Sequence, residues 1–325
     1  MFRSSLAALF ALVLSMHQIA WAAVQEIALK GSEHLLISVP DAVINFQATV
    51  GAKNLRINLI DVAQEDFSIQ TQGDQILIQA KNTDKESFGK LTPGKKHIIE
   101  ISGRALPVEV HAFEAQVQLT HWSKEALIHI QKGRLNSKDG AGTLKAHLQN
   151  GDISILDHQG LVSLDTYKGN VLIKNLSGDL AIENFAGETN IEKARGFLSF
   201  NQGLGGTKIL GSSGSLQFEV SKGNFSVQNF LGRVEGQTIE APVSVQMAND
   251  TEIHLKSKSG KIIVSVAPTS GALLNITSQE GDVFGPSYLK VSREANQKSL
   301  RGRLKGEIQK GSIVIRSQEG AINIR

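Results

Sequence analysis

Apolar and polar residues alternate along most of the chain, and glycine interrupts the alternation at a fixed interval. From residue 133 to residue 232, a glycine stands at every ninth position. In the unit that begins at Gly151, the apolar residues are Ile153 and Ile155, and the unit at Gly178 has Leu180 in the same place. A spacing of two puts alternate side chains on one side of a strand. Each unit therefore predicts a short strand followed by a tight turn.

The repeated glycines are expected to mark these turns. Glycine accepts backbone angles that residues with a Cβ resist. The seventh position of many units holds a short polar residue, such as Asp157, Thr166, Asn175 or Asn184, which favours a turn. The glycines that we assign to structural turns are Gly142, Gly151, Gly160, Gly169, Gly178, Gly187, Gly196, Gly205, Gly214, Gly223 and Gly232.

Short strands at a fixed period predict an all-β protein with a β-solenoid, in which stacked coils bury the apolar side of each strand. The size of one coil follows from a second rhythm. Thr189 and Ile191 recur as Thr207 and Ile209, eighteen residues further along. Two nine-residue strands per coil are therefore expected.

The segment before the glycine rhythm also reads as β structure. Its alternating stretches are residues 42–50, 55–62, 74–80, 97–102 and 108–119. We expect a smaller β-rich region over 23–130 that covers the first coil of a solenoid over 131–325, because an open sheet edge invites aggregation. The rhythm falters over 241–301, and the sequence leaves open whether this irregular segment stays in the stack.

The first 22 residues predict a signal peptide. Arg3 precedes the apolar run 6–14, and small residues follow before Ala23, where the mature chain is expected to begin. A transmembrane anchor is the alternative, but the apolar run is too short to span a bilayer. No later segment is apolar enough for a membrane-spanning helix. The protein is expected to be exported, either to the periplasm or to the cell surface and beyond.

Composition narrows the chemistry. The chain has no cysteine, which excludes disulfides, thiol catalysis and cysteine-ligated metals. Aromatic residues make up only 5 % of the chain, which disfavours a carbohydrate-binding groove lined by Trp and Tyr. Calcium-binding β-rolls also repeat every nine residues. Here Asp follows the unit glycine only at positions 152, 179 and 282, so the rows of carboxylates that calcium needs are missing. We expect no metal and no cofactor.

The phrases GDISILDHQG, GNVLIKNLSGDLAIENFAG, SGKIIVSVAP and SQEGDV, with the ending GEIQKGSIVIRSQEGAINIR, resemble a family of exported bacterial proteins called the putative-adhesin family. The resemblance covers roughly residues 30 to 325. The residues that match the repeated family phrase are Gly151, Asp152, Ile153 and Ile155, then Gly178, Asp179, Leu180 and Ile182, and finally Gly281, Asp282 and Val283. The resemblance implies a β-rich entry segment, a stack of strands and a closing strand. It also implies contact with surfaces, which the word adhesin suggests.

Two groups of side chains invite a chemical interpretation. His129 and His147 are eighteen residues apart, so they would lie on neighbouring coils at a distance that could share a metal. Without a carboxylate ladder to complete such a site, we favour two surface histidines. Glu109 and His111 alternate on one predicted strand and could form a base with its orienting partner. Half-exposed strands produce such pairs routinely, and we expect no enzyme activity.

The basic C-terminal segment is the stronger binding candidate. The formal charge of the chain is +3, yet residues 286–325 carry nine Lys or Arg against three acids. We expect a site for an anionic polymer of the envelope, such as lipopolysaccharide phosphates, teichoic acid or extracellular nucleic acid. Charges that protect the last sheet edge are the alternative, and the one we favour at this point. The candidate residues are Arg293, Lys298, Arg301, Arg303, Lys305 and Lys310, of which Arg301, Arg303 and Lys305 would share one side of a strand.

The sequence thus favours a non-enzymatic exported β-solenoid that acts as an adhesin-like or envelope-interaction module. Its partners would be envelope or surface macromolecules, and its oligomeric state stays open. A periplasmic structural or envelope-stress accessory protein is the second hypothesis. A polysaccharide-cleaving β-helix enzyme is the third, and it is disfavoured because the outward positions lack clustered Asp, Lys or Arg.

Overall fold

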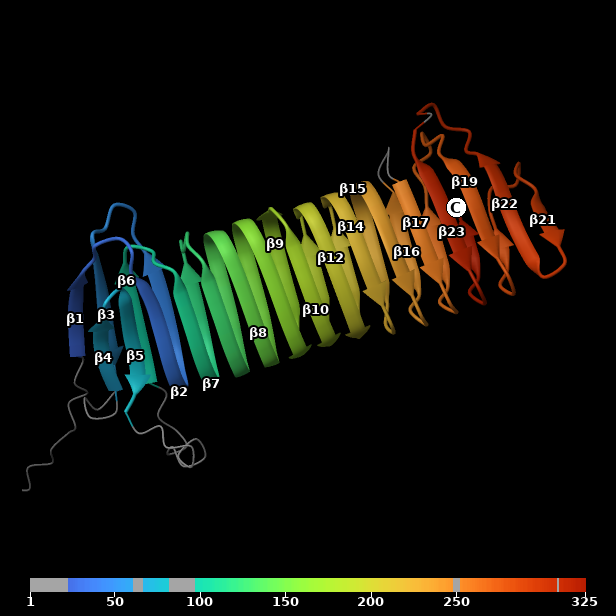
Figure 1. Ribbon diagram of the computed structural model, residues 1–325. Helices are drawn as coiled ribbons and strands as arrows, with labels where there is room; N and C mark the ends of the chain where they lie inside the picture. The colour runs from blue at the N-terminus through green and yellow to red at the C-terminus, as the bar shows by residue number, and fades with distance from the viewer. Residues whose placement is uncertain (1–22, 61–66, 82–96, 248–251, 309) are drawn as a thin grey trace, which may run out of the picture.

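The computed structural model describes residues 23–60, 67–81, 97–247, 252–308 and 310–325, and the expected signal peptide lies outside them. Within this part the protein is all-β and forms a long rod of stacked strands (Figure 1). The expected fold class, a β-solenoid, is confirmed. The strands are β1 (Ala23–Ala28), β2 (His34–Ala48), β3 (Asn54–Ile60), β4 (Phe67–Gln72), β5 (Gln75–Ala80), β6 (His97–Gly103), β7 (Val108–Thr120), β8 (Ala126–Lys168), β9 (Val171–Ser177), β10 (Leu180–Ala186), β11 (Thr189–Glu192), β12 (Arg195–Leu204), β13 (Thr207–Leu210), β14 (Ser213–Val220), β15 (Phe225–Thr238), β16 (Val243–Met247), β17 (Glu252–Ser257), β18 (Ile262–Ser265), β19 (Leu273–Ser278), β20 (Val283–Phe284), β21 (Val291–Glu294), β22 (Gln297–Arg303), β23 (Ser312–Ser317) and β24 (Ile322–Ile324).

The register shows the size of a coil. Leu180 pairs in parallel with Val162 on one side and with Leu198 on the other, so each neighbour is eighteen residues away. Thr189 pairs in the same way with Thr207 on the opposite side of the rod. Each coil therefore contributes one strand to each of two faces. We call face A the side formed by β10, β12, β14, the second half of β15, β17, β23, β19 and β22. Face B carries β9, β11, β13, β16, β18 and β24.

The core is a narrow seam between the two faces. Ile182 on face A and Ile191 on face B are at most 2 % exposed, and their counterparts in neighbouring coils are also buried. Alternation along each strand sends the remaining side chains to solvent. Residue size is matched between coils: Phe218 fills the space below Gly236, where an added Cβ would lie 2.2 Å from the phenyl ring.

The repeated glycines occupy corners where coils approach each other most closely. A Cβ built on Gly178 would lie 2.1 Å from the carbonyl oxygen of Gly160 in the preceding coil. Gly178 also has a φ of +144°, which residues with a side chain rarely adopt. Gly196, one coil further, makes the same approach to the carbonyl of Gly178. The nine-residue rhythm is thus a requirement of backbone stacking at two corners of the coil.

The residue after the glycine connects neighbouring coils. Asp152 accepts a hydrogen bond from the backbone N–H of Asn170 at 3.0 Å. Asn170 then accepts one from the N–H of Glu188, also at 3.0 Å. Asp179 accepts one from the N–H of Phe197 in the same manner. Asp152 and Asp179 of the repeated phrase therefore each satisfy a backbone donor at the corner of the next coil, which is a structural role.

The two corners of a coil differ at the seventh position. One corner carries residues with φ between +52° and +60°, which are His121, Asp139, Asp157, Asn175, Lys193, Gly211 and Asn229. At the other corner Thr166 and Asn184 point into the core and are 1 % exposed. The expectation that these two residues form turns is therefore wrong. They belong to a buried polar row in which Asn184 donates to Thr189, and Thr189 donates to Gln202.

Antiparallel strands close the first end of the stack. On face A, β7 is followed by β2, β5 and finally β4, which pairs antiparallel with β5. On face B, β2 is followed by β6, β3 and β1, and the last two pairings are antiparallel. The region before the glycine rhythm thus continues the solenoid and covers its first coils.

The other end of the stack breaks the order of the chain. On face A, β17 pairs with β23, β23 with β19, β19 with β22, and β22 with β21. On face B, β24 lies between β18 and β20. The last coil of the sequence is therefore inserted between two coils that precede it, which Figure 1 shows as β23 lying between β17 and β19. The segment 241–301 supplies strands on both sides of this insertion.

Candidate binding groove

A polar groove runs across face A near the C-terminal end of the rod. Its volume is about 670 Å³. Five neighbouring strands, β15, β17, β23, β19 and β22, supply most of its lining. The lining residues are Gln237, Thr238, Lys256, Ser257, Lys258, Asn275, Thr277, Ser278, Gln279, Gln297, Arg301, Arg316, Ser317 and Gln318.

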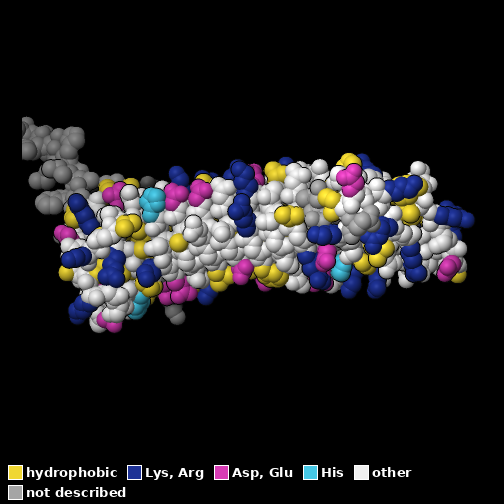
Figure 2. All heavy atoms as spheres, turned by 90° about the horizontal axis from the view of Figure 1, so that it is seen from above, with side chains coloured by type: hydrophobic (Ala, Val, Ile, Leu, Met, Phe, Trp, Pro, Cys, Tyr) yellow, Lys and Arg dark blue, Asp and Glu magenta, His cyan; other side chains and the backbone are white. Residues whose placement is uncertain are grey.

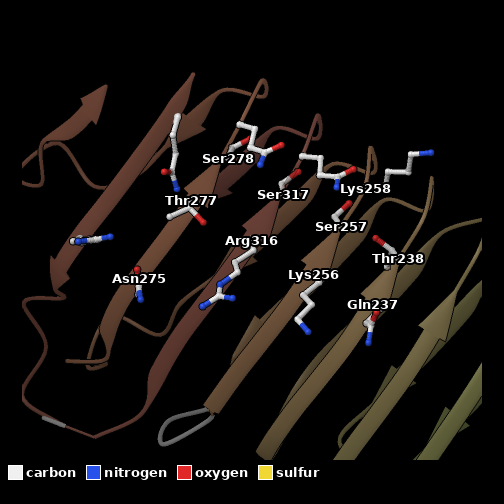
Figure 3. Close-up of a pocket in the computed structure, with 14 residues that line it drawn as sticks. Gln237, Thr238, Lys256, Ser257, Lys258, Asn275, Thr277, Ser278, Arg316 and Ser317 are labelled. Atoms are coloured by element: carbon white, nitrogen blue, oxygen red, sulfur yellow. The ribbon is translucent and has the colours of Figure 1, made fainter. Parts of the chain in front are cut away.

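Four cations line this groove, and no carboxylate does. Lys256 is paired in register with Arg316 on the adjacent strand, and Figure 3 shows their side chains next to each other. Arg301 lies two strands beyond Arg316, opposite Asn275. Lys258 stands at the corner of the coil. All four side chains are exposed. In the part of the chain that the structure describes, none of them has an ion-pair partner.

Neutral polar groups line the groove beside the cations. Gln237, Asn275 and Gln297 are exposed amides that can both donate and accept hydrogen bonds. The hydroxyls at the corner have a structural role, because Ser257 donates to the carbonyl of Gly260 at 2.9 Å and Ser278 donates to that of Gly320. A smaller hollow of about 320 Å³ lies toward the middle of the rod, and there Glu219 and Glu235 enter the lining beside Lys256 and Arg316. Carboxylates therefore adjoin the cationic groove on this side.

The structure separates the six basic residues that the sequence grouped together. Arg301 lies in the groove. Lys298 forms an ion pair with Asp282 at 2.6 Å, and this hydrogen bond from Lys298 holds the pKa of Asp282 below its usual range. Arg303 donates to the carbonyl of Gly271 at 2.9 Å.

The remaining three lie outside the groove lining. The Lys305 ammonium stands 4.5 Å from the centroid of the Tyr288 ring. Lys305 follows the end of β22, so the expectation that it shares a strand with Arg301 and Arg303 is wrong. Arg293 belongs to β21, the outermost described strand of face A, where a charge also protects the sheet edge. Lys310 is exposed beside β23. Figure 2 shows several Lys and Arg side chains at this end of the rod.

Sequence reasoning missed Lys256, Lys258 and Arg316. Lys256 and Arg316 are sixty residues apart in the chain and become neighbours only because β23 inserts beside β17. The single available signal was that both alternate with apolar residues, as outward residues of a strand do. Nothing in the sequence indicates which outward residues share a face.

Three histidines form a row on face A near the other end. His111, His129 and His147 occupy one position in successive coils, and the first two rings are stacked at 5.0 Å. His111 contacts Glu109 at 2.6 Å, and His147 contacts Asp165 at 2.7 Å. Partial desolvation and the two neighbouring imidazoles lower the pKa of His129. Across the described residues, no group of three His, Cys, Asp or Glu has a geometry that could hold a metal ion.

His158 differs from this row because it is buried in the core. Its side chain is 3 % exposed, and its Nε2 lies 3.3 Å from the carbonyl oxygen of Gly142. Its Nδ1 has no hydrogen-bond partner among the described residues. Desolvation lowers the pKa of His158, so the ring stays neutral in the folded protein at pH values where it binds a proton in the unfolded chain.

We expect His158 to make the stability depend on pH. The unfolded ring titrates near pH 6.5, so its contribution is complete above that value and is lost as the pH falls toward the folded pKa. The loss from one group approaches about 1.4 kcal/mol per pH unit. Urea midpoints measured between about pH 7.5 and pH 5 should fall less steeply for His158→Leu, which copies Leu176 in the next coil. His254→Gln is the surface control, and equal slopes in all three proteins would contradict the expectation.

The fold and groove define a β-solenoid whose face A carries an open cationic hollow. The chain belongs to the Toastrack DUF4097 family, whose model matches residues 32–325. This match confirms the family resemblance drawn from the repeated phrases. Among the described residues, no helix is long and apolar enough to cross a membrane.

Solved structures resemble the chain over most of its length. A putative cell adhesion protein from Clostridium sporogenes ATCC 15579 is 10 % identical, with 94 % of this chain and 98 % of that chain covered and a TM-score of 0.24. A putative lipid binding protein from Parabacteroides distasonis ATCC 8503 is 11 % identical, with coverage of 94 % and 96 % and a TM-score of 0.35. A putative adhesin from Bacteroides fragilis NCTC 9343 is 11 % identical, with coverage of 94 % and 97 % and a TM-score of 0.23. The comparison with curated proteins gives no match.

Proposed function

We propose that this protein is an exported, non-enzymatic binding module of the cell envelope, which holds an anionic polymer in the groove of face A. The observation that carries the proposal is the lining of that groove. Lys256, Lys258, Arg301 and Arg316 converge there without a carboxylate to neutralise them. Uncompensated positive charge in a hollow attracts polyanions and raises their rate of association.

A binding role fits this lining better than catalysis. General acid–base chemistry needs a group that gains or loses a proton near the working pH, most often a His, Asp or Glu. The groove lining has none of these residues. Its long open shape, with side chains drawn from five strands, suits many weak contacts to an extended ligand.

The groove cations are expected to account for most of the affinity. We compare the triple variant Lys256→Gln/Arg301→Gln/Arg316→Gln with the wild-type protein for binding to immobilised dextran sulfate. Loss of three exposed contacts at about 0.5–1 kcal/mol each should weaken binding about 10- to 100-fold and flatten its dependence on salt.

The matched control is Lys124→Gln/Lys168→Gln/Lys208→Gln, which removes the same charge from exposed positions outside the groove. It should bind nearly as well as wild type. Equal weakening in the two variants would show that only net charge matters, and unchanged binding in the groove variant would refute the groove as the site.

Protease treatment of intact cells tests export. Cleavage would place the protein on the surface, and release on outer-layer disruption would place it in the periplasm. Retention in the cytoplasm would contradict export.

A further inference from the structure

The cations of the groove are arranged along the axis of the rod. Lys256 lies on β17, Arg316 on the next strand β23, and Arg301 two strands further on β22. Neighbouring strands are about 4.8 Å apart, so the row from Lys256 to Arg301 extends over about 14 Å. A single small anion cannot contact all three side chains. The arrangement fits a linear ligand that lies across the strands and repeats its charge at intervals.

The groups between the cations are amides and hydroxyls. Asn275 and Thr277 lie on β19, between the strands that carry Arg316 and Arg301, and Gln237 and Gln297 stand at the two ends. Figure 3 shows Gln237, Asn275 and Thr277 in the groove lining with Lys256 and Arg316. Side-chain amides donate and accept hydrogen bonds at once, which matches the hydroxyl groups of sugars. The groove therefore combines a row of positive charge with groups that bind neutral polar chains.

The same lining disfavours nucleic acid. Proteins that bind single strands without sequence preference stack bases on aromatic side chains. No aromatic residue is among the lining residues that the structure describes. The exposed rings of Tyr167 and Phe185 stack on each other at 4.9 Å, but neither residue lines the groove.

Charge density also separates the classes of polyanion. Glu219 and Glu235 line the adjoining hollow toward the middle of the rod together with Lys256 and Arg316, and Glu235 is paired with Arg233 at 3.0 Å. A chain with dense charge, such as a polyphosphate, would be repelled there by Glu219, which has no ion-pair partner among the described residues. A chain with one carboxylate per sugar has neutral hydroxyls to place there. Arginine also binds carboxylates through two parallel hydrogen bonds, which suits Arg301 and Arg316.

We propose that the groove binds an acidic polysaccharide, a chain of the uronic-acid type, laid along the rod axis across β17, β23, β19 and β22. This inference rests on the proposed function and specifies its ligand class. Arg301 and Arg316 hold carboxylates of the chain, and Lys256 contributes a third cation. The amide of Asn275 binds sugar hydroxyls between the charges, and those of Gln237 and Gln297 bind them at the two ends of the groove.

The test uses the chain from Ala23 and measures dissociation constants at one ionic strength near physiological. The probes are polygalacturonate, inorganic polyphosphate and single-stranded poly(dT). The decisive variant is Gln237→Ala/Asn275→Ala/Gln297→Ala, which removes exposed amides without changing the charge. Its control is Gln118→Ala/Asn136→Ala/Asn190→Ala, which removes exposed amides from other coils. Thermal melts check that each variant remains folded before its binding is compared.

Polygalacturonate should bind at least tenfold more tightly than polyphosphate or poly(dT). The groove amide variant should bind polygalacturonate about five- to tenfold more weakly than wild type. The control variant should bind it as tightly as wild type. If polyphosphate or poly(dT) binds as tightly, or if loss of the amides has no effect, the polysaccharide inference is overturned while the cationic groove stands. If none of the three polyanions binds, the inference and the proposed function fail together.

Discussion

Removal of residues 311–325 is expected to unfold the C-terminal coils and leave the middle of the rod intact. β23 pairs with both β17 and β19, and β24 pairs with both β18 and β20. The deletion therefore leaves strand edges facing an empty slot on both faces. It also removes four core isoleucines, which are Ile313, Ile315, Ile322 and Ile324, each at most 2 % exposed. At about 1.5–3 kcal/mol for each buried side chain, the loss is about 6–12 kcal/mol, an upper bound because unfolded chains are partly compact.

Hydrogen exchange measures this outcome strand by strand. In stacked repeats each coil is stabilised mainly by its neighbours, so protection should disappear over β17–β22 and persist over β9–β14. A synthetic peptide of residues 311–325, added in trans, should restore protection because both slots remain open to it. Unchanged protection over β17–β22 in the truncated chain would show that the inserted coil does not hold this end together.

The glycine rhythm allowed the solenoid to be predicted from sequence, and the recurrence of Thr189 and Ile191 as Thr207 and Ile209 gave its eighteen-residue coil. The cause is local. A Cβ on Gly178 would lie 2.1 Å from the carbonyl oxygen of Gly160, so this corner requires glycine, and the glycines repeat with the period of the corners. The order of coils at the C-terminal end is not local. Ile253 pairs with Ile313 instead of with a residue one coil later, and alternation is the same for either partner. Strand pattern therefore predicts which side chains face inward and leaves the neighbouring strand undetermined.

The candidate site was also predictable only where its residues are close together in the sequence. Arg301 was found because the basic residues of 286–325 are close in sequence, and the structure places it in the groove. Its partner Arg316 belongs to the same basic segment, but Lys256 comes from another part of the chain, and a count of charge along the sequence could not bring Lys256 and Arg316 together. Arg303 and Lys305 look equivalent to Arg301 in the sequence. Their contacts with the Gly271 carbonyl and the Tyr288 ring depend on segments that fold around them.

Replacement of Gly178 by alanine should destabilise the protein by about 2–4 kcal/mol, which is a large effect for a single methyl group. Two costs combine at this position. The φ of +144° is unfavourable for any residue with a Cβ, and the new methyl would stand 2.1 Å from the carbonyl oxygen of Gly160. Relief of the clash requires the coils to separate at that corner. Separation would weaken the hydrogen bond that joins these two coils at the corner, from the Val162 N–H to the carbonyl of Asp179, which is 2.9 Å long.

Gly211 supplies the matched control, because it has positive φ without the close approach. Its φ is +60°, and nothing lies within 4 Å of an added Cβ. Asn175 and Asn229 hold the same position in other coils with φ of +55° and +54°. Gly211→Asn should therefore shift stability by less than about 0.5 kcal/mol, since asparagine tolerates this conformation. Denaturant midpoints of the two variants test this account: similar midpoints would mean that neither the φ near +144° nor the backbone approach between coils reserves these corners for glycine, whereas a large gap assigns the nine-residue period to the two together.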